Sequence, residues 1–355
     1  MNQPFDLALD FDDVLLVPQR STIKSRNDVS LATQITPSIK LDFPLTSTNM
    51  DCVTGVDMAL TMSRYGSISF YPRFQTIKDQ VADIKSILKQ KQRAIPSVGI
   101  KPTEHDRVKA LVEIGIKTIF IDVAHAHLES CLDFIKQTKK EYKKLEIIVG
   151  VISTYQAAHD LFSLGVDAVH VGVAPGSICS TRVVTGHGMP QITAILEVSK
   201  AASKFGKYVI ANGGMRNSGD VIKALAAGAH AVTVGNILAG TDEAPGKIIT
   251  RQGCKYKAYN GSTSQVEKNK HAKNNPKDKK KNYTLHVEGI AGFVPYKGQI
   301  SNILNQYAAS IRSGFSYSNA HDIWQLHDNA RFVRVTKNIS SRNQNRQILL
   351  ANEIT

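Results

Sequence analysis

A cysteine and a threonine two positions apart are the residues of this chain best suited to chemistry. Cys179 and Thr181 lie in the segment Gly172-Val-Ala-Pro-Gly-Ser-Ile-Cys-Ser-Thr-Arg182, directly after the β-like run 168–173. Folds with parallel strands place their reactive groups where the strands end. A thiol beside the N–H groups of a glycine-containing loop can act as a nucleophile, although a cysteine taken alone is more often a small buried residue.

The segments around this loop predict a repeated strand–helix fold. Eight β-like runs lack the alternation of polar and apolar residues, as expected for strands covered on both faces, and helical periodicity fills the gaps between them. Eight such units predict one α/β domain over residues 1–355, a (β/α)8 or TIM barrel, with a doubly wound sheet as the alternative. The runs are 44–49, 67–72, 95–100, 118–124, 146–152, 168–174, 208–214 and 231–237, and the helical segments are 77–91, 104–114, 128–143, 156–164, 192–205 and 218–227.

Glycines end the seventh and eighth predicted strands. Asn212-Gly213-Gly214 closes one strand and Gly235-Asn236 the other. Barrels of this kind commonly bind phosphate at these two ends, and glycine lets backbone N–H groups approach an anion closely. Ordinary turns would explain either pair alone, but both pairs together predict a phosphate-bearing ligand.

The net charge of +14 is unevenly spread along the chain. Residues 268–281 hold seven lysines and one aspartate, which accounts for +6 of the total. Such a run is usually a solvated loop, and near an active site it can also attract anionic substrates. We expect no nucleic-acid partner, because no zinc-finger, RNA-recognition or helix-turn-helix signature accompanies the run.

Features tied to compartment predict a cytoplasmic protein with no membrane partner. The chain has no apolar run of eighteen residues, and it does not begin with a basic and apolar leader. Its four cysteines are far apart and form no CxxC, which argues against disulfides and against a zinc site.

The strand–helix pattern breaks after the eighth predicted strand. Residues 254–299 are polar and have no regular period. A structureless stretch of this length in a compact domain is usually either a functional lid or disordered, and we expect a mobile flap at about residues 254–298. Helical periodicity returns at 300–313.

Several long motifs, in the same order along the chain, give the sequence a family resemblance. From about residue 8 to 336 it resembles the family of inosine-monophosphate dehydrogenases and guanosine-monophosphate reductases. The resemblance implies a barrel fold, a homotetramer, a purine-nucleotide substrate and a nicotinamide cofactor. The motifs are Asp10-Phe-Asp-Asp-Val-Leu-Leu-Val-Pro18, Asn49-Met-Asp-Cys-Val-Thr54, Ala174-Pro-Gly-Ser-Ile-Cys-Ser-Thr-Arg182, Asn212-Gly-Gly-Met-Arg-Asn-Ser-Gly-Asp220, Leu238-Ala-Gly-Thr-Asp-Glu-Ala-Pro-Gly246 and Val294-Pro-Tyr-Lys-Gly298.

The resemblance also implies roles for individual residues. Cys179 would attack C2 of the purine, Thr181 would help to activate water or ammonia, and Glu288 would contact the base. Asp122 would hold the nicotinamide ribose of NADPH, with Ala124 and His125 beside it. Backbone carbonyls of Ala174, Gly176 and Cys179 would bind a monovalent cation, usually potassium. The implied substrate-binding residues are Met50, Ser177, Asn212, Gly213, Gly214, Gly235, Asn236, Tyr259 and Gly261.

The direction of the reaction rests on two absences. Most dehydrogenases of the family carry CBS regulatory domains after the second strand, but residues 74–95 here have room for one helix only. The arginine of the dehydrogenase flap has no counterpart between residues 262 and 287. Residues 69–74 and 330–335 look like the reductase, whereas 238–246 and 292–298 look closer to the dehydrogenase.

We therefore interpret the chain as a GMP reductase, which converts GMP to IMP and ammonia with NADPH through a covalent cysteine adduct. A dehydrogenase-type oxidoreductase without CBS domains is one alternative. Departures from the family pattern leave a second, a divergent paralogue of low activity that acts on a modified purine nucleotide. These departures are Asn212 in place of the ribose-binding aspartate, together with Ala174, Val151, Ser262 and Thr263.

Overall fold

Eight parallel strands form a closed barrel, as the sequence predicted. The computed structural model describes residues 6–274 and 287–336. Neighbouring strands pair in the order β4-β11-β10-β9-β8-β7-β6-β5, and a parallel bridge between Ser47 and Ser69 closes the ring. The strands are β4 (Leu45–Ser47), β5 (Phe70–Tyr71), β6 (Ile95–Val98), β7 (Thr118–Asp122), β8 (Glu146–Ile152), β9 (Ala168–Val171), β10 (Tyr208–Asn212) and β11 (Ala231–Val234).

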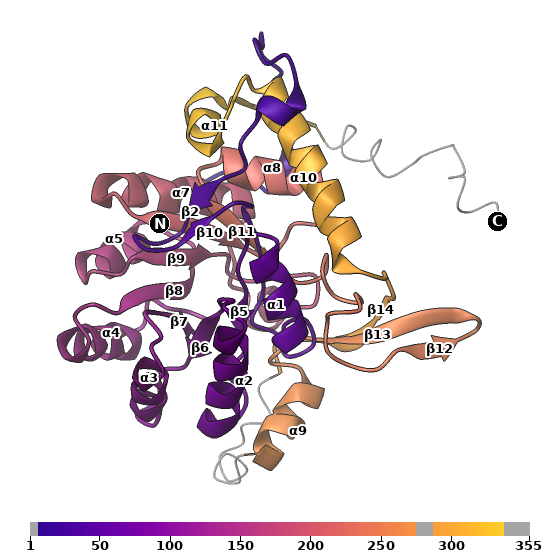
Figure 1. Cartoon of the computed structure of the whole chain (residues 1–355). Helices are drawn as coiled ribbons and strands as arrows, with labels where there is room; N and C mark the ends of the chain where they lie inside the picture. Colours follow the sequence, from indigo (N-terminus) through magenta and orange to yellow (C-terminus); the bar gives the residue numbers. More distant parts are fainter. Residues whose placement is uncertain (1–5, 275–286, 337–355) are drawn as a thin grey trace.

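Helices surround the barrel strands (Figure 1). Side-chain caps at Thr76, Thr154 and Asn217 satisfy free N–H groups of three helix starts, and Gly206 ends another helix in the left-handed conformation. The helices between strands are α1 (Val56–Arg64), α2 (Ile77–Lys89), α3 (Glu104–Glu113), α4 (Glu129–Glu141), α5 (Tyr155–Ser163), α7 (Gln191–Phe205) and α8 (Ser218–Ala226). α10 (Ile300–Tyr317), the longest helix of the described residues, packs against α8.

A short hairpin plugs the amino-terminal end of the barrel. It consists of β2 (Thr33–Gln34) and β3 (Lys40–Leu41), and its apolar side chains join the inward-facing residues of the strands in one buried cluster. Glu146, the first residue of β8, accepts hydrogen bonds from the hydroxyl groups of Thr36 and Ser38 at 2.7 Å each. The plug leaves the opposite, carboxyl end of the barrel for the loops that follow the strands.

The polar stretch after β11 is more ordered than its sequence indicated. β12 (Ile249–Arg251), β13 (Cys254–Asn260) and β14 (Ala291–Pro295) form an antiparallel sheet that projects from the barrel in Figure 1, and α9 (Gln265–Asn274) follows β13. The expectation of a structureless stretch was wrong for these elements. Lys257 shows why the polar composition was misleading. Its side chain is buried, and its Nζ donates to the carbonyls of Thr241, Asp242 and Ala244, which ties β13 to the barrel. Lys277, Lys279, Lys280 and Lys281 lie outside the described residues.

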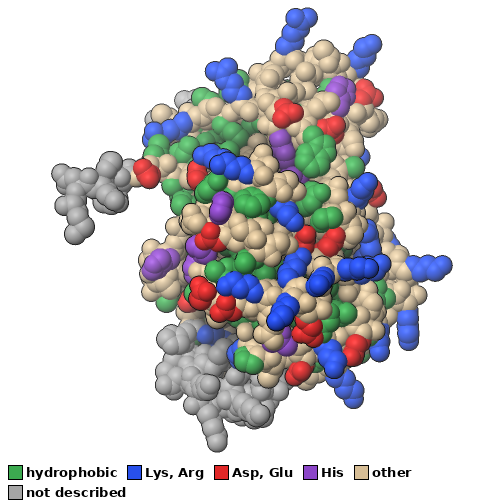
Figure 2. Space-filling view, turned by 90° about the vertical axis from the view of Figure 1, so that its left-hand side faces the viewer, with side chains coloured by type: hydrophobic (Ala, Val, Ile, Leu, Met, Phe, Trp, Pro, Cys, Tyr) green, Lys and Arg blue, Asp and Glu red, His purple; other side chains and the backbone are tan. Residues whose placement is uncertain are grey.

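The ends of the described chain meet on the barrel surface. β1 (Val14–Leu16) pairs with β15 (Phe332–Arg334), which follows α11 (Ile323–Asn329). On the face shown in Figure 2, basic side chains are spread among acidic ones rather than gathered into one patch. Among the described residues, no helix has the length and apolar character that crossing a membrane requires.

Candidate active site

The Cys179 loop follows the carboxyl end of β9. Cys179 is exposed, and its N–H donates to the carbonyl of Gly176 at 3.1 Å. The Sγ atom lies 3.2 Å from Oγ1 of Thr181, the first residue of the short helix α6 (Thr181–Thr185). The turn into this loop requires Gly172, since a Cβ there would lie 2.3 Å from the carbonyl oxygen of Asn212. The loop therefore presents the thiol and the hydroxyl together.

The segment around Glu288 completes a chain of three polar groups. Thr181 Oγ1 donates to the Glu288 carboxylate at 2.8 Å. The backbone holds this contact in register, because the N–H of Ser180 donates to the carbonyl of Glu288 at 3.0 Å and the N–H of Ile290 donates to the carbonyl of Ile178 at 3.0 Å. The structure thus brings together Cys179, Thr181 and Glu288, the three residues predicted to be catalytic.

Gly289 joins this segment to a second loop. It forms one bridge with Cys179 and another with Ser264, and the nearby Gly261 donates its N–H to the carbonyl of Ile290 at 2.9 Å. A Cβ at Gly261 would lie 3.3 Å from the Cα of Gly289, so the chain packs tightly here. The predicted base-binding residue Gly261 therefore lies beside the predicted nucleophile loop.

Several of the residues predicted to bind substrate lie around Tyr259. Its ring is buried, and a Cβ placed on Gly235 would come within 2.9 Å of its hydroxyl and 3.6 Å of Met50 Sδ. Burial raises the pKa of the Tyr259 hydroxyl, and a hydrogen bond with Ser177 partly opposes this rise. The hydroxyl is therefore a neutral donor at neutral pH, which suits an anionic oxygen atom.

A pair of lysine contacts, which sequence reasoning did not identify, supports the same region. Lys297 Nζ donates to the carbonyls of Asn236 and Ile237 at 2.5 and 3.2 Å. The contact fixes the turn after β11, where Gly235 and Asn236 were predicted to bind phosphate. Burial lowers the pKa of Lys297.

Gln191, the first residue of α7, supports the loop after β10. Gly213 and Gly214 both have positive φ, at +79° and +84°, and both face Pro175 of the neighbouring loop. The buried Gln191 donates from Nε2 to the carbonyls of Val171 and Asn212 at 2.9 and 3.4 Å. One amide group thus ties the ends of β9 and β10 together.

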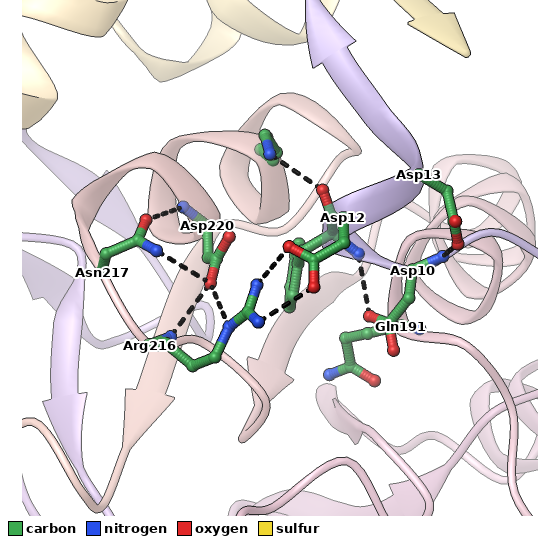
Figure 3. Close-up of polar contacts among 9 residues, drawn as sticks. Asp10, Asp12, Asp13, Gln191, Arg216, Asn217 and Asp220 are labelled. Carbon is green, nitrogen blue, oxygen red and sulfur yellow. Dashed lines mark hydrogen bonds and ion pairs between the residues drawn. The ribbon is translucent and has the colours of Figure 1, made fainter. Parts of the chain in front are cut away.

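An ion-pair network connects the loop after β10 to the amino-terminal segment (Figure 3). Arg216 contacts the Asp12 carboxylate with both terminal nitrogens, at 2.9 and 2.5 Å, and its Nε lies 3.1 Å from Asp220. Arg216 holds the pKa of Asp12 below its ordinary value. Asp10, whose backbone N–H is capped by Asp13, accepts the Gln191 N–H at 3.4 Å. The motifs 10–18 and 212–220 are therefore joined by ion pairs that fix the loop after β10.

The predicted cofactor residues lie at the carboxyl end of β7, where Asp122 is the last residue of the strand and Ala124 and His125 follow it. The Asp122 carboxylate is 3.0 Å from Nε of Arg73, whose guanidinium also lies 4.2 Å from the centre of the Phe74 ring. Ala124 and His125 are exposed. Burial, followed by the charges of His127 and His187, lowers the pKa of His125. His187 follows α6, so its effect on His125 places the end of that helix within electrostatic range of one predicted cofactor residue.

A carboxylate and an arginine side by side fit a dinucleotide, because they can bind ribose hydroxyls and phosphate respectively. Arg73 was not identified from sequence. The carbonyls predicted to bind a cation belong to one loop, in which Ala174 has a φ of +61°. Within the described residues, no cluster of His, Cys, Asp and Glu is arranged to hold a metal ion.

Comparisons with known proteins agree with this geometry. The sequence matches the IMP dehydrogenase / GMP reductase domain over residues 8–344. It is 35% identical over 381 residues to an inosine-5'-monophosphate dehydrogenase of Borreliella burgdorferi, covering 93% of this chain and 94% of that protein. It is 29% identical over 470 residues to a GMP reductase of Leishmania donovani, with coverage of 93% and 94%.

A solved structure shows the same fold. A GMP reductase variant from Trypanosoma brucei, in complex with guanosine 5'-monophosphate, superimposes with a TM-score of 0.90 at 26% identity and covers 98% of this chain and 99% of that one. A closed barrel and relatives of these kinds define the class as (β/α)8-barrel oxidoreductases that use a nicotinamide cofactor. The chain belongs to the IMP dehydrogenase/GMP reductase family.

Proposed function

We propose that this protein is a GMP reductase, which uses NADPH to convert GMP to IMP and ammonia. The observation that supports it best is the chain from Cys179 through Thr181 to Glu288, with separations of 3.2 and 2.8 Å. A nucleophile beside a hydroxyl and a carboxylate can form a covalent adduct and hand a proton to a leaving group.

The residues divide the reaction into two steps. Cys179 Sγ adds to C2 of the purine, and its proton passes through Thr181 to the ionised Glu288. The bond from C2 to the exocyclic amine then breaks while Glu288, now protonated, returns that proton to the departing ammonia. The bound nicotinamide supplies the hydride that C2 then takes up. The carbon–sulfur bond breaks, and Cys179 leaves as the thiolate. Overall, GMP, NADPH and two protons give IMP, ammonium and NADP⁺.

The remaining assignments belong to the same proposal. Met50, Ser177, Gly235 and Tyr259 would bind the nucleotide phosphate and base, and their proximity around the Tyr259 hydroxyl supports this role. Asp122, with Arg73 as a neighbour, would hold the cofactor. A potassium ion on the carbonyls of Ala174, Gly176 and Cys179, a homotetramer and a cytoplasmic location complete the proposal. The further contacts to the nucleotide would come from Asn212, Gly213, Gly214, Asn236 and Gly261.

A dehydrogenase is the second candidate, because similar relatives carry that name. The dehydrogenase reaction must hydrolyse the adduct on Cys179 with an activated water. Positioned base catalysis contributes about 10²–10⁴ in rate, and residues 262–287 contain no arginine to supply it. A divergent paralogue would bind nucleotide with little turnover.

A direct comparison of the two directions tests the proposal. NADPH consumption is measured with GMP, and NADH formation with IMP and NAD, on the same preparation. We expect turnover with GMP to be the faster. Multiple turnovers of IMP at a higher rate would assign the dehydrogenase, whereas nucleotide binding without turnover in either direction would assign the paralogue. Cys179→Ala provides the blank.

A further inference from the structure

We propose that Lys268 is a positioning residue for the reaction, the cation that faces Glu288 and holds its carboxylate toward Thr181. Lys268 lies in α9, at the start of the lysine run that its composition marks as a solvated loop. Its side chain is nevertheless 6% exposed. A lysine is rarely buried to this extent without a specific partner, so its location requires an explanation.

The backbone places Lys268 beside Glu288. Ser264 forms a bridge with Gly289, the residue after Glu288, and a Cβ on Gly289 would lie 3.2 Å from the Ser264 nitrogen. Lys268 donates its N–H to the Ser264 carbonyl at 2.9 Å, so it stands one helical turn after that bridge. Because side chains four residues apart share one face of a helix, the Lys268 side chain leaves α9 on the side of Ser264.

The charges agree with this placement. Burial lowers the pKa of Lys268, and the charge of Glu288 opposes that change. The Glu288 carboxylate accepts the Thr181 hydroxyl of α6 and lies within electrostatic range of Lys268 from α9, while the Ser180 N–H donates to the Glu288 backbone carbonyl. The neighbouring Glu267 points elsewhere, since its Oε1 accepts a hydrogen bond from Asn260 Nδ2 at 3.0 Å.

In this proposal, four polar groups form an array: the Lys268 cation, the Glu288 carboxylate, the neutral Thr181 hydroxyl and the Cys179 thiol. A cation beside Glu288 favours its ionised form, which can only accept the Thr181 hydrogen. Thr181 is then fixed with an oxygen lone pair available to the Cys179 thiol. Without Lys268, an uncompensated carboxylate would remain two groups away from Cys179, and like charge disfavours a thiolate.

The test compares Lys268→Met with Lys268→Arg and with a matched control, Lys247→Met, whose side chain is exposed. The first readout needs no turnover. Each variant is alkylated with iodoacetamide, and peptide mass spectrometry follows Cys179 against the exposed Cys254 as an internal reference. We expect slower alkylation of Cys179 in Lys268→Met alone, by about threefold or more, and wild-type behaviour in Lys268→Arg and Lys247→Met.

A double-variant cycle separates the array from a general effect of the flap. In a Glu288→Gln background, Lys268→Met should leave Cys179 alkylation unchanged, because the charge it compensates is gone. Equal Cys179 rates in wild type and Lys268→Met would overturn the proposal, as would an effect that persists in the Glu288→Gln background. Altered Cys254 labelling would show that Lys268→Met is misfolded. The Cys179 alkylation rate of Lys268→Arg then decides, because a wild-type rate supports the proposal and a slower rate overturns it.

Kinetics supply the second readout and rest on the proposed function. With GMP and NADPH, Lys268→Met should lower kcat at least about tenfold while KM changes little, since Glu288 acts on the leaving amine. A change confined to KM would mean that Lys268 only attracts the anionic substrate and would overturn the positioning role. If wild type fails with GMP, the proposed function is wrong, but the alkylation result for Lys268 still stands.

Discussion

The Thr181 hydroxyl donates a hydrogen bond of 2.8 Å to Glu288, a residue 107 positions away. This contact joins the loop after β9 to the segment before β14, and the backbone bonds of Ser180 and Ile290 flank it on both sides. The three residues predicted to be catalytic are therefore brought together by two segments, the loop after β9 and the insertion after β11.

Replacing the thiol should remove turnover and spare binding. In Cys179→Ala, the covalent route is lost, whereas the residues around Tyr259 and the loop of Gly213 and Gly214 are untouched. We expect no NADPH consumption above the blank, with GMP affinity by calorimetry close to wild type. Cys254→Ala, at the other exposed cysteine, is the matched control and should be fully active. Substantial turnover by Cys179→Ala would rule out the covalent mechanism.

The contribution of the Thr181 hydroxyl can be tested separately from that of side-chain size. Thr181→Val keeps the size of the side chain but removes the contacts at 3.2 Å to Cys179 and 2.8 Å to Glu288. We expect kcat to fall by about 10²-fold with little change in KM, as is typical for a lost proton-transfer group. Thr181→Ser keeps the hydroxyl and should retain most of the activity. A Val variant as active as the Ser variant would place proton transfer elsewhere.

The barrel was predictable from sequence because its signal is local. Strands buried on both faces form short continuous apolar runs, and the predicted run 146–152 coincides with β8. The loop glycines were also visible, since a residue such as Gly213 must adopt a positive φ. Contacts with partners that are distant along the chain could not be predicted from the sequence. Arg73 and Lys297 look like ordinary surface residues until the fold places them against Asp122 and Asn236.

The insertion after β11 gives two further examples of contacts that the sequence does not reveal. Lys257 and Lys268 are both buried, and both lie in stretches whose composition indicates solvent exposure. Lys257 bonds to the carbonyls after β11, and we propose that Lys268 faces Glu288; no periodicity along the chain reveals either relationship. A charged residue is buried where a partner compensates it, and that partner is set by tertiary structure.

Restoring a carboxylate at the end of β10 should tighten nucleotide binding. Asn212 stands where the family pattern has an aspartate, and its amide offers one uncharged acceptor oxygen where a carboxylate offers two charged ones. Hydrogen bonds to a charged group contribute about 1.5–3 kcal/mol each, so Asn212→Asp should lower the Kd for GMP by about tenfold or more. Asn217→Asp on the neighbouring helix cap is a matched control. Weaker binding in Asn212→Asp would indicate a pocket rebuilt around a different sugar.

His170 should make the stability of the protein depend on pH. It lies in β9 inside the barrel, 0% exposed, with its ring 4.3 Å from the rings of Phe70 and Phe120. Neither ring nitrogen has a hydrogen-bond partner within the described residues, and burial lowers the pKa of His170 to about 3. The folded protein therefore keeps this imidazole neutral across the range in which a free histidine becomes charged.

The direction of this pH dependence follows from the difference in proton uptake between the folded and the unfolded chain. As the pH falls through about 6.5, His170 in the unfolded chain binds a proton that the folded form does not bind until about pH 3, so the stability that His170 contributes is lost on acidification. Between pH 7.5 and 5 this loss is about 2 kcal/mol. His170→Leu should therefore reduce the fall in unfolding free energy over this interval by about that amount, whatever its effect at pH 7.5. Urea unfolding at both pH values measures it, with the exposed His321→Leu as control. Equal pH dependence in wild type and His170→Leu would show that His170 is charged, or reached by water, in the folded barrel.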